Sequence, residues 1–264
     1  MLAGIKNFFK RSFLENRPYR TFAIALLSSV LFIASLYCAF FTSGYADFFT
    51  SLFISIFAAA LYAFALFSIY RIAPLRSPDI LLVMSVPIAL AILFRIYCLD
   101  HVTTDYTVFL SQWTNYFRDN GGFLALDSSI GNYNIPYLYF LALFSYLPFP
   151  DLYLIKLLSV FFDFILALYC TKLLSVFTKN QTKLQLCYCI VLLLPTVLLN
   201  GSYWGQCDSI YVSFAIMSLY YALSGRPFLS VSLLAVSFSF KLQAVFFMPI
   251  FLLLLFSKHI RIRH

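Results

Sequence analysis

The sequence predicts an all-α, polytopic integral membrane protein with about eight transmembrane helices and an interfacial helix in its first large outer loop. Apolar residues make up 62% of the chain and charged residues only 11%, which would leave a soluble protein of this size coated in exposed hydrocarbon. Several uncharged stretches reach the roughly 20 residues that a helix needs to cross a bilayer. The basic residues, in addition, gather at the ends of these stretches.

The net charge of +8 indicates orientation rather than a nucleic-acid partner, because the cations form no continuous basic face. Five of them precede the first apolar stretch: Lys6, Lys10, Arg11, Arg17 and Arg20. Basic flanks favour the cytoplasmic side. We therefore expect a multi-pass protein of the cell membrane with both termini in the cytoplasm, the C-terminus being the basic tail 258–264.

Residues 1–79 are expected to form a cytoplasmic segment followed by a two-helix membrane hairpin, with spans over 21–46 and 48–70. The first stretch is too long for the apolar region of a signal peptide, and more spans follow it. Residues 80–257 are expected to form the transmembrane core. Its first span, 80–99, delivers the long polar outer loop 100–134.

The next apolar stretch, 135–149, is short for a span and is better interpreted as a re-entrant or interfacial helix. If it crossed, Lys172, Lys179 and Lys183 would lie outside; if it does not, they are cytoplasmic, as the positive-inside rule prefers. We adopt the second version. The remaining predicted spans are 152–177, 184–199, 209–223, 228–240 and the apolar run that ends before Lys258.

Within the outer loop, helical spacing relates five apolar residues: Tyr106, Phe109, Leu110, Trp113 and Phe117. Such a helix would lie flat in the interface and stop at Gly121 and Gly122. Asp105 stands at its N-terminus. Propensity alone favours an N-cap role for this carboxylate, but at the membrane surface it could also meet a lipid headgroup and a water-borne substrate together.

Two other polar groups are predicted to reach the same side as Asp105. The turn 201–208 carries Trp204, Gln206 and Asp208 between two spans, and Lys241 and Gln243 interrupt an otherwise uncharged run. Polar groups at such depth are costly unless they are used or solvated. An ordinary polar turn and a snorkelling lysine are the alternatives.

Three further charges lie inside predicted spans. Arg95 would either snorkel to the surface or hold an anionic phosphate. Lys156 and Asp163, seven residues apart, share one helical face, which favours a structural role between helices.

Several of these features recur in one order along residues 80–255. They are Arg95 near the end of a span, Thr104-Asp-Tyr106 with Trp113 eight positions after Asp105, Gly121, Tyr133-Asn-Ile-Pro-Tyr137, Gly205-Gln-Cys-Asp208 and Phe240-Lys-Leu-Gln243. This ordered set resembles the membrane glycosyltransferases of the GT-C superfamily, and in particular bacterial proteins related to the mannosyltransferase that adds the second mannose to GPI anchors.

The resemblance implies transfer of a hexose, mannose or glucose, from a polyprenyl-phosphate donor to an extracytoplasmic glycan, lipid or protein acceptor. Asp105 matches the catalytic residue of the superfamily and is expected to be the base of an inverting displacement. Arg95 and Lys241 are the candidates for binding the leaving phosphate. The remaining expected substrate-binding residues are Tyr106, Trp113, Tyr133, Trp204, Gln206, Asp208 and Gln243.

No cofactor or metal is expected, because no cluster of hard ligands is evident and the six Cys residues lie mostly in apolar runs. A disulfide between Cys98 and Cys207 is a minor alternative. Two other functions stay open. The charges inside the spans suggest a transporter or lipid flippase, and a chain shorter than its relatives suggests a truncated, non-catalytic member that requires a partner membrane subunit.

Overall fold

The computed structural model describes residues 30, 32–34, 36–37, 47–72, 78–127 and 130–256. Every regular element within these residues is a helix, so the all-α prediction is confirmed for them. The predicted cytoplasmic N-terminal segment, most of the first predicted span and the basic tail 258–264 lie outside the described residues.

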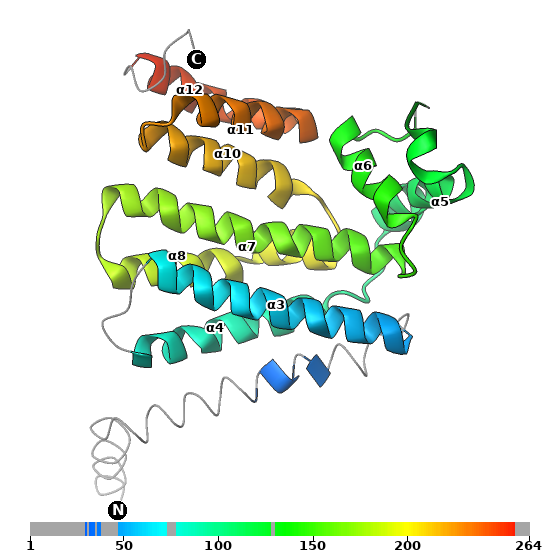
Figure 1. Cartoon of the computed structure of the whole chain (residues 1–264), viewed down its shortest axis with the longest axis horizontal. Coiled ribbons are helices and arrows are strands. Elements are labelled where there is room, and N and C mark those ends of the chain that lie inside the picture. Colours follow the sequence, from blue (N-terminus) through cyan, green and yellow to red (C-terminus); the bar gives the residue numbers. More distant parts are fainter. Residues whose placement is uncertain are drawn as a thin grey trace, which may run out of the picture.

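The described chain runs back and forth along one axis, so that its long helices lie side by side (Figure 1). The helices in chain order are α3 (Phe48–Ile72), α4 (Pro78–Tyr97), η2 (Tyr106–Leu110), α5 (Ser111–Asp119), η3 (Gly122–Asp127), α6 (Ile135–Phe144), α7 (Asp151–Phe177), α8 (Gln181–Leu193), α9 (Pro195–Leu198), η4 (Leu199–Tyr203), α10 (Asp208–Leu223), α11 (Pro227–Phe240), η5 (Leu242–Phe247) and α12 (Met248–Phe256). Helices α5 and α6 gather beyond one end of this bundle, which we call the loop end.

The two ends of the bundle differ in charge. Described carboxylates at the loop end are Asp47, Asp100, Asp105, Asp119, Asp127, Asp151 and Asp208. Basic residues at the opposite end are Arg71, Lys172, Lys179, Lys183 and Arg226. Arg118 and Lys241 also lie at the loop end, so the described carboxylates outnumber the basic residues there but do not exclude them.

Helices α3 and α7, with 25 and 27 residues, are long and apolar enough to cross a membrane, and α8 with α9 and η4 would be a third span with a 48° bend. Helices α4, α6, α10, α11 and the η5–α12 run are apolar but shorter. Large apolar side chains such as Phe67 and Leu253 are 62% and 67% exposed, which fits contact with lipid. These features are compatible with a membrane protein, and eight passes stay a prediction.

Proline explains two departures from the predicted elements. The stretch 135–149 is helical only to Phe144, because Pro148 has no N–H to donate to the Phe144 carbonyl and its ring would clash with that carbonyl in a continued helix. A ten-residue helix is about 15 Å long, half the thickness of the hydrocarbon core. The span predicted over 184–199 bends after Leu193, where Leu194 precedes Pro195 and adopts an extended ψ of 124°.

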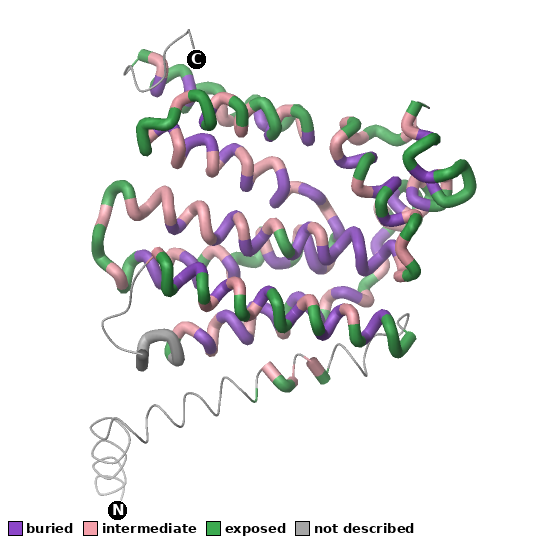
Figure 2. The backbone as a smooth tube through the Cα atoms, in the orientation of Figure 1, coloured by how far each residue is buried: buried purple, intermediate pink, exposed green. Residues whose placement is uncertain are grey.

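Helix α7 is the centre of the bundle. It packs against α3, α8 and α10, and 78% of its most apolar segment is buried, compared with 39% for α3. Burial is densest in the half of α7 nearest the loop end (Figure 2). Any polar side chain on this half must therefore find its partner within the protein.

Three polar side chains lie on one face of α7, three and four residues apart: Lys156, Ser159 and Asp163. We call them the polar face of α7. Asp163 accepts hydrogen bonds from Arg95 Nε, at 2.9 Å, and from the Ser209 hydroxyl. The prediction that Lys156 and Asp163 have structural roles is thereby confirmed for Asp163, which joins α7 to α4 and α10.

Lys156 also has a structural role, in the part of α7 nearer the loop end. Its ammonium donates to the carbonyl oxygens of Cys98, Leu99 and His101 at 3.0, 2.9 and 2.6 Å. Its aliphatic stem packs against Gly205, where an added Cβ would lie 3.7 Å from Lys156 Cγ. Lys156 thus holds the end of α4 and touches the turn that follows η4.

Candidate active site

Thr103, and not Asp105, caps the helix that opens the loop 100–134. The Thr103 hydroxyl accepts a hydrogen bond from the backbone N–H of Tyr106 at 3.3 Å, whereas the Asp105 side chain makes no capping bond. The Asp105 backbone is already helical, with φ −60° and ψ −38°, whereas an N-cap residue normally has non-helical backbone angles. The capping interpretation of Asp105 is therefore wrong, and its carboxylate is available for another contact.

That contact is with the turn 201–208, 101 residues further along the chain. Gln206 Nε2 donates to Asp105 Oδ2 at 2.8 Å, and Gln206 Oε1 accepts from the Tyr133 hydroxyl at 3.0 Å. A carboxylate only accepts hydrogen bonds, which fixes the orientation of the amide between them. Burial raises the pKa of Tyr133 far above its usual value, so the phenol keeps its proton and donates it.

The backbone around Gln206 is held by two further bonds. Ser159 on the polar face of α7 donates to the Gln206 carbonyl oxygen at 2.8 Å, and the Gln206 N–H donates to Asn200 at 2.9 Å. The elements next to Asp105 and Gln206, η2 and η4, are both π-helices. Such widened turns are frequent at functional sites.

A cavity of about 180 Å³ opens in front of the Asp105 carboxylate. The lining residues are Asp105, Phe109, Leu110, Trp113, Asn132, Tyr133 and Gln206. We call this space the carboxylate cavity. It combines aromatic rings with amide and carboxylate groups, and it draws them from three separate parts of the chain.

Trp113 is fixed in this wall by its neighbours. Its indole meets the Tyr133 ring edge-on, with centroids 5.6 Å apart. Gly131, at φ +77°, lies so close that an added Cβ would be 3.0 Å from Trp113 Cδ2. Only glycine combines that backbone with that approach, so the indole is clamped by the segment that also supplies Asn132 and Tyr133.

Lys241 and Asp208 form an ion pair beside this cavity. Asn200 Nδ2 donates to the other carboxylate oxygen of Asp208 at 3.2 Å, and the Lys241 ammonium lies 5.8 Å from the centre of the Tyr133 ring. Burial alone would lower the pKa of Lys241, but the hydrogen bond and charge of Asp208 outweigh it and the pKa is raised. The ammonium therefore stays charged near neutral pH.

A second space, of about 530 Å³, lies on the Lys241 side of Tyr133. Its walls are formed by Asn132, Tyr133, Asn134, Phe240, Lys241, Leu242, Gln243, Val245 and Phe246. We call it the lysine cavity. It shares Asn132 and Tyr133 with the carboxylate cavity, so the two spaces are neighbours, and Lys241 is its one charged lining residue within the described chain.

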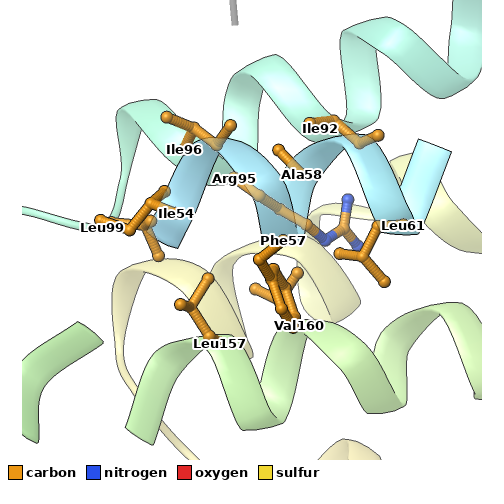
Figure 3. A pocket seen from close by; sticks show the side chains of 10 residues that line it. All are labelled: Ile54, Phe57, Ala58, Leu61, Ile92, Arg95, Ile96, Leu99, Leu157 and Val160. Atoms are coloured by element: carbon orange, nitrogen blue, oxygen red, sulfur yellow. The ribbon is translucent and has the colours of Figure 1, made fainter. Parts of the chain in front are cut away.

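Arg95 does not join this site. Its side chain is 1% exposed and is bound by Asp163 and by the carbonyl oxygens of Ala91 and Leu192 at 3.1 and 2.9 Å. Figure 3 shows it among apolar side chains of α3, α4 and α7, around a void of about 10 Å³. That volume is at the lower limit for one water molecule, so the structure offers Arg95 neither the surface nor a phosphate.

Two other predicted site residues point elsewhere. The Tyr106 hydroxyl donates to Asp151 Oδ1 at 3.0 Å, and burial followed by the Asp151 charge raises the pKa of Tyr106 to about 12. The Trp204 ring is 50% exposed and packs edge-on against Tyr203. Neither side chain lines either cavity.

Sequence reasoning missed Phe109 as a lining residue and did not single out Asn132 or Asn200. Asn132 precedes the Tyr133 motif directly, and Asn200 is a polar residue at the end of an apolar run. Both signals are too common in loops to identify a site alone.

Comparison of the chain with protein-family models, curated proteins and solved structures finds no match. Within the described residues, no group of three or more His, Cys, Asp or Glu side chains is placed to hold a metal ion. Cys98 and Cys207 are both free thiols, so the disulfide considered between them is absent. The site is thus described by its own geometry alone.

Replacement of Thr103 by Val tests the role of its hydroxyl, which caps the helix and also donates to the Trp204 carbonyl oxygen at 3.4 Å. Val keeps the branched shape but removes the hydroxyl, so the unfolding free energy should fall by about 1 kcal/mol. Thr103→Ser keeps the hydroxyl and is the matched control. Chemical denaturation in detergent micelles, followed by helical circular dichroism, measures both; equal stability of the two variants would contradict the assignment.

Proposed function

We propose that this chain is a membrane glycosyltransferase that moves a hexose from a polyprenyl-phosphate donor to an acceptor hydroxyl. The main support for this proposal is the carboxylate cavity, whose lining combines the Asp105 carboxylate with aromatic rings and side-chain amides. The ordered motifs that resemble the GT-C superfamily suggest the reaction class.

The lining of the carboxylate cavity suits a sugar. The rings of Trp113 and Tyr133 offer flat apolar surfaces to the C–H faces of a pyranose. The amides of Asn132 and Gln206 both donate and accept hydrogen bonds, as sugar hydroxyls require. A space with a few placed polar groups among apolar walls is the usual form of a small-molecule site.

Asp105 would act as the general base. Gln206 binds its Oδ2, and no described residue donates to its Oδ1, which leaves that oxygen for the acceptor hydroxyl. The acceptor oxygen attacks C1 of the sugar, the C1–O bond to phosphate breaks, and the phosphate leaves with the electron pair. The hydroxyl proton passes to Asp105. One displacement inverts the configuration at C1.

The donor would occupy the lysine cavity with its phosphate at Lys241. A positioned cation stabilises the charge that grows on the leaving phosphate. The same cavity carries Phe240, Leu242 and Phe246, which offer apolar surface to an isoprenoid chain. Gln243 and Asn134 line it as well and can hydrogen-bond polar groups of either substrate.

Substitution of Asp105 by Asn should abolish most of the transfer activity. The amide keeps an oxygen that accepts from Gln206 but cannot take up the hydroxyl proton, so we expect a loss of about 10²- to 10⁴-fold in rate. Transfer of radiolabelled mannose or glucose from polyprenyl-phosphate donors, measured in membranes, gives the rate. Asp119→Asn, an exposed carboxylate on α5, should retain full activity; equal rates for both variants would remove Asp105 from the mechanism.

We further propose that the loop end faces outward. The basic residues at the opposite end of the bundle support this, because basic flanks favour the cytoplasmic side. A single cysteine at Asp119, in a variant lacking the native cysteines, should react with an impermeant maleimide added to intact cells. A single cysteine at Lys179 should react only after permeabilisation, and the reverse pattern would overturn the orientation.

A further inference from the structure

An anion that bound Lys241 would compete with Asp208, which already forms an ion pair with this lysine. Lys241 lines the lysine cavity, whereas Asp208 does not. The Lys241 ammonium, which faces this cavity, is therefore already paired with the carboxylate of Asp208, which lies outside the cavity lining. Asn200 donates to the second oxygen of Asp208 at 3.2 Å, so the carboxylate has a second partner that does not depend on Lys241.

The pair is built to exchange partners. The Lys241 side chain is 19% exposed and that of Asp208 34% exposed, so neither charge is locked in the core as Arg95 and Asp163 are. Partly solvated ion pairs contribute little net stability. The flexible stem of a lysine lets its ammonium swing between two acceptors without moving the backbone.

We infer that Asp208 is a competing counter-ion, which holds Lys241 while the lysine cavity is empty, yields it to the phosphate of a lipid-linked donor, and reclaims it to release the lipid phosphate. This inference rests on the proposed function and assigns Asp208 a positioning role that acts through Lys241.

The charges of substrate and product explain why a competitor is useful. A polyprenyl-phosphate sugar is a phosphodiester with one negative charge. When the C1–O bond breaks, the leaving group keeps the electron pair and becomes a monoester, which carries about −1.5 to −2 charges at neutral pH. Lys241 alone would bind this product more tightly than the donor, and a neighbouring carboxylate offsets that gain.

A purely structural role makes the opposite prediction. If the pair only joined α10 to the end of α11, its loss would loosen Lys241 and weaken any ligand in the lysine cavity. If Asp208 competes with the ligand, its loss strengthens anion binding. The sign of the change in affinity therefore separates the two accounts.

The experiment measures binding of farnesyl phosphate to the full chain in lipid nanodiscs by isothermal titration calorimetry. We expect Asp208→Asn, which still accepts from Asn200, to bind it about two- to fivefold more tightly than wild type, because a partly exposed ion pair is worth up to about 1 kcal/mol. Farnesol, which lacks the anion, should bind both proteins equally. Asp119→Asn controls for the change in net charge, and Lys241→Gln should lose the preference for farnesyl phosphate over farnesol.

Unchanged or weaker binding of farnesyl phosphate to Asp208→Asn would overturn the inference. Should that variant fail to fold, Asp208→Ser removes the same charge and carries the same expectation. In transfer assays Asp208→Asn should lower both KM and kcat, because the donor binds better and the product leaves more slowly. Tighter phosphate binding without any sugar transfer by wild type would sustain the competition and reject the glycosyltransferase reaction.

Discussion

A buried helix that carries charged side chains into an apolar bundle must pair each of them, because an unpaired buried charge costs several kcal/mol. The polar side chains of α7 find their partners in chain segments that flank the candidate site on both sides. Lys156 binds the carbonyl oxygens at the end of α4, Ser159 binds the carbonyl of Gln206, and Asp163 binds Arg95 and Ser209. The need for pairing thus determines where two distant loops lie.

The site follows from that placement. The end of α4 leads directly into Thr103 and Asp105, and the turn after η4 presents Gln206, so fixing both to α7 brings a carboxylate and an amide within 2.8 Å. The charges inside the bundle that suggested a transporter are used in this way: Arg95, Lys156 and Asp163 all have protein partners. Lys241 differs, because its partner Asp208 is partly exposed and its ammonium faces an open cavity.

The sequence predicted the features that depend on local pattern. The helix of the loop 100–134 ends at Asp119, just before Gly121 and Gly122, and the shared face of Lys156 and Asp163 follows from helical periodicity. Asp105, Gln206, Tyr133 and Lys241 were expected only to lie on the same side. The structure adds that Gln206 bridges Asp105 and Tyr133 and that Lys241 lines the neighbouring cavity. The GT-C assignment stays a prediction.

Other features depend on contacts that no local pattern contains. Arg95 pairs with Asp163 across 68 residues, and nothing near Arg95 distinguishes a buried partner from a phosphate. Thr103 and Asp105 are both good capping residues, so propensity could not decide between them. The ring of Trp204 faces away from the cavities because η4 and its hydrogen bond to Leu199 set the direction of that backbone, which spacing alone does not reveal.

The polar face of α7 holds the loop 100–134 in place through the bonds of Lys156 and Ser159. Hydrogen–deuterium exchange of Lys156→Met and wild type in detergent micelles tests it most directly, since Met has a similar length but cannot bind the three carbonyl oxygens. We expect faster exchange over residues 98–107 and unchanged exchange over 181–193, in the helix that begins at the opposite end of the bundle. Unchanged exchange over 98–107 would contradict it.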